Sequence, residues 1–197
     1  KSRKRGYASM QWKNWYCFLN PPSGWNWICC NSVYVITDLI HDQMSPILFI
    51  ALCLGAVLMM EFVAWSAHKF LMHGPLWNWH EDHHKKDHTS GSWWEKNDRF
   101  FLVFATPGII CLFAGSFTSA TWLFPIGLGI TIYGAIYFLI HDVYIHRRFK
   151  WFRHLDSKYS RAVLRAHGAH HAKTTKEDCE SFGLLAVNSK FLKNNRK

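Results

Sequence analysis

Cysteine motifs are absent from this chain of 197 residues, although it contains six cysteines. None of them forms a CxxC pair, Cys29 and Cys30 are adjacent, and Cys53 and Cys111 lie inside apolar stretches. Disulfide frameworks and cysteine-based zinc sites depend on paired, regularly spaced cysteines. The sequence therefore predicts neither kind of site, and we interpret the cysteines as small buried hydrophobic residues.

Acidic residues are scarce, with 13 against 23 basic residues and a formal net charge of +10. Such a balance is typical of proteins that meet nucleic acid or an anionic membrane surface. Hydrophobic residues nevertheless make up 49% of the chain, and they gather in long stretches. These stretches favour the membrane, so we expect a lipid bilayer and not nucleic acid as a partner.

Charge is almost missing from three of these stretches. Residues 46–67 contain a single charged residue, Glu61, and residues 100–117 and 121–140 contain none. A helix needs about 20 apolar residues to cross a bilayer, and three stretches of this length are long for the core helices of a soluble bundle. The sequence therefore predicts an all-α integral membrane helical bundle, in which "SFTSAT" joins the last two spans as a hairpin.

A recognisable signal peptide is also missing. The basic "KSRKR" opens the chain, but no uninterrupted apolar region follows it. One interpretation is that the natural chain starts at Met44 and that residues 1–43 are an extension that is not native; the other is that residues 25–40 form an extra membrane segment. We expect an atypical extension over residues 1–43, a membrane domain over residues 44–187 and a basic tail over residues 188–197.

Histidine, in contrast, is abundant and regularly placed. Ten of the 13 histidines fall into four boxes, "HKFLMH", "HEDHH", "HDVYIH" and "HGAHH". The spacing HxxxxH followed by HxxHH thus occurs twice, which indicates an internal repeat in the pattern of ligands. The box residues are His68 and His73; His80, His83 and His84; His141 and His146; and His167, His170 and His171.

The three predicted spans bring all four boxes to one side of the membrane. The first span ends beside the first box, the second span begins after the second box, and the third span ends at the third box. The basic stretch "HRRFKWFRH" and the lysine-rich tail share this side. Positive residues favour the cytoplasm, so we expect the histidine-rich site on the cytoplasmic side.

The spacing within each box bears on whether its histidines can share a metal. On an α-helix the three histidines of HxxHH fall within about a 100° arc and can converge. The two histidines of HxxxxH lie about 140° apart on an ideal helix. Both of them can bind only if the metals lie between helices, or if the helix is locally overwound or bulged; the sequence leaves this open.

Ten imidazoles are enough for two metal ions with about five ligands each. Imidazole binds iron, zinc, copper and nickel, so the ligand type alone does not name the metal. Oxidation of an inert C–H bond needs a metal that activates O₂, and zinc has no redox chemistry. The histidine pattern therefore predicts a di-metal site, and two irons would suit such a reaction.

Carboxylates near the boxes are candidates to orient the ligands through the second imidazole nitrogen. Asp82 and Asp142 are candidates by adjacency, although an ordinary hydrated charge at a helix end explains them equally well. Glu61 lies inside an apolar span, where an ionisable group is costly and usually faces protein or a functional cavity. We expect it to support the ligands or to pair helices.

The boxes and their flanking sequences resemble a known family. Four stretches resemble, in the same order, the bacterial β-carotene hydroxylase family, within the fatty-acid hydroxylase and sterol desaturase superfamily: "MEFVAWSAHKFLMHGPLWNWHEDHH", "NDRFFLVFA", "YGAIYFLIHDVYIHRRF" and "AHGAHHA…CESFGLL". The resemblance covers about residues 58–187 and implies that residues 44–187 form a membrane hydroxylase domain. Residues 1–43 have no counterpart in typical bacterial members.

The resemblance implies a non-haem di-iron monooxygenase, a β-carotene 3-hydroxylase that converts β-carotene to β-cryptoxanthin and then to zeaxanthin. It implies two Fe ions held by the ten box histidines, O₂ as co-substrate, a carotenoid substrate and electrons from reduced ferredoxin. Two alternatives remain: a related di-iron hydroxylase or desaturase acting on a sterol or fatty acyl chain, and a membrane metal-binding or transport protein. Transport would require ionisable groups along the spans, where only Glu61 occurs.

Overall fold

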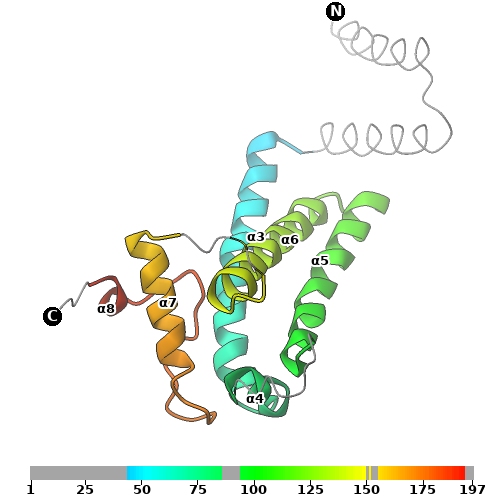
Figure 1. Ribbon diagram of the computed structural model, residues 1–197. Helices are drawn as coiled ribbons and strands as arrows, with labels where there is room; N and C mark the ends of the chain where they lie inside the picture. Colours follow the sequence, from blue (N-terminus) through cyan, green and yellow to red (C-terminus); the bar gives the residue numbers. More distant parts are fainter. Residues whose placement is uncertain (1–43, 86–93, 150, 152–154, 194–197) are drawn as a thin grey trace, which may run out of the picture. The chain divides into compact units, whose positions relative to one another are not determined.

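The computed structural model describes residues 44–85, 94–149, 151 and 155–193. Every regular element among these residues is a helix (Figure 1), as the sequence predicts. The helices belong to one compact unit, residues 46–197. Residues 1–43, which we expect to be an extension, and residues 194–197 of the basic tail lie outside the described residues.

Three long apolar helices confirm the predicted spans. They are α3 (Pro46–Ala67), α5 (Arg99–Phe117) and α6 (Leu123–Tyr137), and each belongs to a continuous helical segment long and apolar enough to cross a membrane. Many of their apolar side chains remain exposed: Ile47 is 80% exposed, Leu58 74% and Phe117 77%. An apolar surface of this extent is unfavourable in water and suits contact with lipid.

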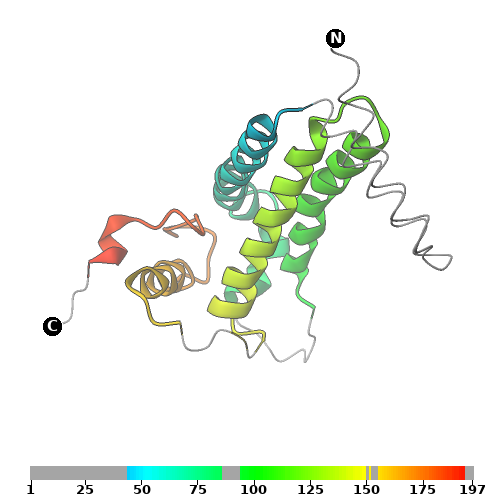
Figure 2. The same ribbon diagram turned by 90° about the horizontal axis from the view of Figure 1, so that it is seen from above.

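Helix α6 packs against both α3 and α5 (Figures 1 and 2). Two glycines permit this close approach, because a Cβ at Gly129 would lie 2.4 Å from the carbonyl oxygen of Cys53, and one at Gly127 would lie 2.6 Å from the amide nitrogen of Leu112. Residues two apart lie about 200° apart around a helix, so each glycine serves a different neighbour. Small residues at such contacts are the usual means of helix packing in membranes.

The first and third spans both end in a π-helix, which resolves the question of the HxxxxH boxes. Helix α3 continues as η1 (His68–Met72) and α6 as η4 (Phe138–Ile145), so the third span extends beyond residue 140, where the sequence predicts its end. The amide of His73 donates to the carbonyl of His68 at 3.1 Å, and that of His146 to His141 at 2.9 Å. An i→i+5 turn brings positions five apart onto one side, so the helix is bulged and not overwound.

Two shorter helices carry the HxxHH boxes, and both lie near the box-bearing end of the spans. Helix α4 (Trp77–Lys85) follows η1, and a 3₁₀ turn η3 (Lys96–Asp98) leads into α5. Helix α7 (Lys158–His170) begins at the capping residue Ser157, whose hydroxyl accepts from the amide of Ser160 at 3.0 Å. The irregular segment 171–188 then returns past the site to the short helix α8 (Ser189–Leu192), which packs on α7.

Candidate metal centre

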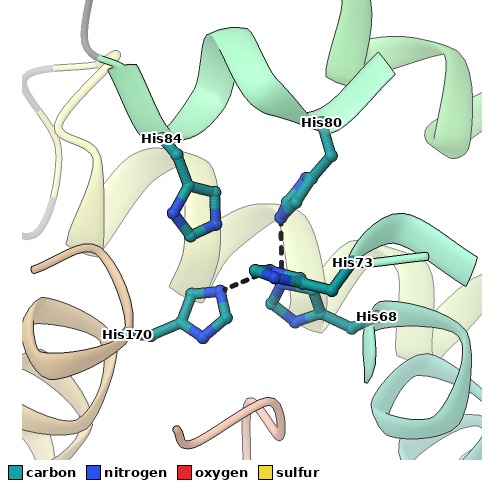
Figure 3. Close-up of side chains that lie close together, drawn as sticks. All are labelled: His68, His73, His80, His84 and His170. Carbon is teal, nitrogen blue, oxygen red and sulfur yellow. Dashed lines mark hydrogen bonds between the residues drawn. The ribbon is translucent and has the colours of Figure 1, made fainter. Parts of the chain in front are cut away.

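The structure gathers nine of the ten box histidines into two groups. In each group the ligand atoms offered by the rings lie within 4.8 Å of one another. Figure 3 shows the first group, which converges from η1, α4 and α7. All nine are buried except His146, which is half-buried. The first group is His68, His73, His80, His84 and His170, and the second group is His83, His141, His146 and His167.

Helix geometry explains how the boxes are divided. Both histidines of each HxxxxH box belong to the same group, because the π-turn of the box brings the two imidazoles to one side of the helix. On α4, His80 and His84 lie about 40° apart, whereas His83 lies to one side of them and joins the other group. On α7, His167 and His170 separate in the same way. Each HxxHH box therefore contributes to both groups and links them.

His171 is the box histidine that belongs to neither group. Its ring stacks on His84 with the centroids 4.5 Å apart, and it lies 4.4 Å from His167 and 4.8 Å from His83. Both of its ring nitrogens are buried without a hydrogen-bond partner, as is Nε2 of His84. Such orphaned nitrogens are costly unless a ligand satisfies them.

In the first group, almost every outer nitrogen is held by the backbone. The Nδ1 atoms of four histidines donate to carbonyl oxygens in the segment 173–182, and that of His80 lies 2.7 Å from the side-chain oxygen of Asn97. A carbonyl can only accept, so these Nδ1 atoms carry the proton. The four pairs are His68 with Phe182 (3.0 Å), His73 with Lys176 (3.1 Å), His84 with Lys173 (2.9 Å) and His170 with Glu180 (2.9 Å).

In the second group, carboxylates support two of the four histidines. Nδ1 of His83 lies 3.1 Å from Oε2 of Glu95, and Nδ1 of His141 lies 3.4 Å from Oδ2 of Asp142. Arg148 in turn donates to Asp142 at 2.9 Å. Its two terminal nitrogens also donate to the two carboxylate oxygens of Asp98, at 2.7 and 2.9 Å. Burial raises the pKa of Glu95, and the positive charge of Arg148 opposes this effect.

The inner nitrogens face one another at short range. The Nε2 atoms are 3.0 Å apart between His68 and His80 and 3.2 Å apart between His73 and His170 in the first group. They are 3.2 Å apart between His83 and His141 and 2.8 Å apart between His146 and His167 in the second. Where both Nδ1 atoms carry the proton, both Nε2 atoms present lone pairs, which repel unless a cation lies between them.

These distances fit a metal ion. Imidazole nitrogens bind metals at about 2.0–2.1 Å, so two of them at right angles around one ion stand about 3.0 Å apart. The outer hydrogen bonds are also those that orient metal-bound imidazoles in known sites. The residues present therefore suit a nitrogen-rich site for two ions, one in each group.

Protonation does not replace metal binding in these groups, because burial disfavours the charged imidazolium. Burial is the main cause that lowers the pKa of His84 to about 4 and of His170 to about 3. The same cause lowers the pKa of five further box histidines outside the spans: His73, His80, His83, His167 and His171. These imidazoles are thus neutral at pH 7 and free to bind a metal.

The three carboxylates singled out from the sequence have different surroundings. Asp142 contacts His141, as described above. Asp82 accepts from the backbone amide of Lys96 at 2.7 Å, so this bond holds the turn before α5 and not a histidine. Glu61 accepts from the amides of residues 184–186 at 2.8–3.0 Å through Oε1 and from the hydroxyl of Tyr133 at 2.8 Å through Oε2. It fastens the segment whose carbonyls hold His68 and His170.

Sequence reasoning missed Glu95 and Asn97, which hold His83 and His80. Their position in "WEKND", directly before the second span and on the side of the boxes, is a signal that could have identified them. The supporting carbonyls of residues 173–182 left no such signal, because a backbone oxygen is present at every residue.

A cavity of about 590 Å³ lies between α3, α5 and α6. Apolar side chains line most of it, and it ends at His141 and Asp142. Cavities of about 300–1,000 Å³ with this character commonly bind small molecules. The second histidine group therefore borders a space large enough for an apolar ligand.

Three apolar spans with two buried histidine groups at one end define a membrane-type helical bundle with a candidate di-metal centre. The chain belongs to the fatty acid hydroxylase family, whose model matches residues 53–189. This finding confirms the family resemblance seen in the sequence.

Several relatives are similar to the chain over about two thirds of its length. It is 43% identical to "Beta-carotene hydroxylase" of Paracoccus sp. (strain N81106 / MBIC 01143), with 66% of this chain and 79% of the relative covered. It is 41% identical to the protein of the same name from Pantoea ananas, with 66% and 71% covered. It is also 41% identical to "Beta-carotene 3-hydroxylase 1, chloroplastic" of Arabidopsis thaliana, with 68% and 43% covered. No solved structure matches the chain.

Proposed function

We propose that this protein is a β-carotene 3-hydroxylase, which converts β-carotene to β-cryptoxanthin and then to zeaxanthin. The bacterial relatives named for β-carotene hydroxylation support this substrate, since the chain covers more than two thirds of their length. In the reaction one oxygen atom of O₂ enters a ring C–H bond. The other leaves as water after uptake of two electrons and two protons.

The ten box histidines are proposed to hold two iron ions. The observation that carries this proposal is the set of paired Nε2 atoms, 2.8–3.2 Å apart, whose outer nitrogens are largely committed to acceptors. By the internal repeat His171 corresponds to His84, so it completes the second group as His84 completes the first. Two bound irons would supply the activation of O₂.

The protein's own residues prepare the site for this chemistry. The carbonyls of residues 173–182 orient four histidines of the first group, and Glu95 and Asp142 make the imidazoles of His83 and His141 more basic. Burial keeps bulk water from the histidines. The apolar cavity offers the substrate a path from the bilayer to His141.

We further propose that the histidine end of the spans lies on the cytoplasmic side and receives electrons from a reduced ferredoxin. The basic stretch over residues 146–154 supports both parts of this proposal, although Lys150 and residues 152–154 lie outside the described residues. Positive residues favour the cytoplasmic side, and they attract acidic partners.

Expression in β-carotene-producing cells tests the function. Cells with the full chain, and cells with a chain starting at Met44, should accumulate β-cryptoxanthin and zeaxanthin under air, as seen by pigment chromatography. The His83→Ala variant, expressed at the same level, should yield neither pigment. Absence of hydroxylated pigment with a functional ferredoxin system present would contradict the assignment. So would purified protein that contains one zinc ion, or turnover that persists without O₂.

A further inference from the structure

The cavity between the spans is elongated along the helices. Its lining runs from Ile109 on α5 to Asn97 on η3, and along α6 and η4 from Ile130 to Asp142. Twelve residues of helix correspond to about 18 Å. One end of the cavity therefore lies within the apolar part of the spans, and the other lies at the level of the histidines.

The part of the cavity away from the histidines is suited to a hydrocarbon. The hydroxyl of Thr131 donates to the carbonyl of Gly127 at 2.8 Å, and that of Tyr133 donates to Glu61 at 2.8 Å. These two polar side chains of the lining away from the histidines thus have partners within the protein. The neighbouring lining residues, such as Phe104 and Ile130, are apolar.

The cavity reaches the outer surface of the bundle on the side of α5. Phe101 and Ile109 line it and are nevertheless 58% and 53% exposed. Both belong to a membrane span, so this exposed surface faces lipid. A substrate dissolved in the bilayer can enter here without passing through water.

The inner end of the cavity meets the second histidine group. His141 belongs to its lining, whereas none of the five histidines of the first group does. Ala64, Tyr137 and His141 line both the cavity and a gap of about 10 Å³, which His68 and His167 also border. The ring of Tyr137 stacks on His141 with the centroids 4.9 Å apart.

We propose that this cavity is the site for one ring of the carotenoid, which enters end-on from the bilayer and stops at Tyr137 and His141. The inference rests on the proposed function and adds a binding site and an orientation to it. In a six-membered ring carrying the polyene at C6, C3 is the opposite carbon. End-on entry therefore presents C3 first to the second histidine group, which accounts for hydroxylation at C3 rather than along the chain.

Gly134 provides a means to test this site. It lines the cavity about two turns before His141, and a Cβ built on it meets nothing within 4 Å. A leucine there extends into the space that the ring must pass. Gly55 on α3 is the matched control, because a Cβ there also meets nothing within 4 Å and the residue does not line the cavity.

The experiment compares full-length wild type, Gly134→Leu and Gly55→Leu, purified with iron in nanodiscs and supplied with β-carotene. Binding is read from the induced circular dichroism of the bound polyene, and turnover from the hydroxylated products. Gly134→Leu should lose roughly tenfold or more of both signals, with unchanged iron content, while Gly55→Leu should match wild type. Ala105→Phe, which narrows the cavity from α5, should behave like Gly134→Leu and replaces it if that variant does not fold.

The outcomes separate this inference from the proposed function. If wild type hydroxylates β-carotene and both cavity variants do so equally well, the cavity is not the ring site although the function stands. If wild type makes no product but binds β-carotene with a signal that Gly134→Leu abolishes, the cavity is a polyene site and the proposed function fails. Iron loss from Gly134→Leu, with Ala105→Phe fully active, would also overturn the inference.

Discussion

The two histidine groups have the same kind of ligand but different support. In the first group four outer nitrogens donate to backbone carbonyls of the segment 173–182, which are neutral acceptors. In the second, Glu95 and Asp142 accept from His83 and His141, and Arg148 holds Asp142 in place. Four histidines of the first group therefore depend on the position of a loop, and two of the second depend on negatively charged side chains.

This difference would give the two proposed metals different environments. A carboxylate behind an imidazole raises the basicity of the ligand and favours a more highly charged metal ion. The second group is also the one that borders the cavity. The internal repeat thus supplies two similar sets of histidines. The carboxylates, however, support only the second group, which is the group that the substrate is proposed to approach.

Removal of a ligand should have the largest effect and should act on one group at a time. His83 and His84 are neighbours on α4 but belong to different groups. We expect His83→Ala and His84→Ala each to abolish hydroxylation and to lower the iron content from about two ions to about one per chain. Iron analysis and Mössbauer spectra of the two variants should identify different remaining sites.

The adjacent Lys85→Ala variant is the control, because Lys85 is exposed and pairs with Glu81. It should retain both ions and full activity. A single common spectrum for the two histidine variants would mean that the groups are not separate metal sites.

Acid should destabilise the metal-free protein through both groups. The pKa values of the box histidines outside the spans are lowered by burial, to about 4 for His84 and about 3 for His170. An unfolded histidine, with a pKa of about 6.5, binds a proton first as the pH falls. Stability is therefore complete above about pH 6.5 and declines below it.

Where burial lowers the pKa of a histidine by one, the free energy of unfolding at low pH falls by about 1.4 kcal/mol. We expect the melting temperature of the iron-stripped protein to fall by roughly 10 °C between pH 7 and pH 5, as measured by tryptophan fluorescence in detergent. A melting temperature that is constant over this range would contradict the buried neutral state of the histidines.

Loss of the carboxylate that contacts His83 should weaken metal binding in the second group only. Glu95→Gln keeps the size of the side chain and an acceptor oxygen but removes the charge. We expect the affinity of the second metal to fall by about 10- to 100-fold, as measured by competition with a chelator. Asn97→Ala, which acts on His80, should instead weaken the first metal, and equal loss of both metals from Glu95→Gln would argue against separate support.

Glu61 should act on the first group from a distance. Its Oε1 accepts three backbone amides of residues 184–186, which follow directly on the carbonyls that hold His68 and His170. We expect Glu61→Gln to lower the affinity of the first metal by about tenfold and to leave the second metal unchanged. Tyr133→Phe removes only the bond to Oε2 and should have a smaller effect; a selective loss of the second metal would contradict the prediction.

Much of the membrane architecture follows from the sequence. The three spans are local features, because about 20 successive apolar residues are sufficient to define each of them. The four boxes, their order and their flanking residues are sufficient to indicate the family. The narrow arc of the HxxHH histidines also predicts that they converge on a metal. It does not predict that His80 and His84 belong to the first group and His83 to the second.

The tertiary structure decided the remaining features of the site. The π-turns that align His68 with His73 and His141 with His146 are a choice of backbone hydrogen bonding that the spacing leaves open. The carbonyls behind the first group belong to a segment about 100 residues distant from His68 and His73.

The sequence by itself therefore determined the spans, the supply of ligands and the family, because hydropathy and residue type are properties of each stretch of chain. Which histidines share a group, which acceptors hold them and where the cavity meets them depend on contacts between distant segments. Those contacts arise only when α3, α6 and α7 come together. A backbone oxygen is present at every residue and a cavity is formed by several segments, so no residue type in the sequence marks either of them.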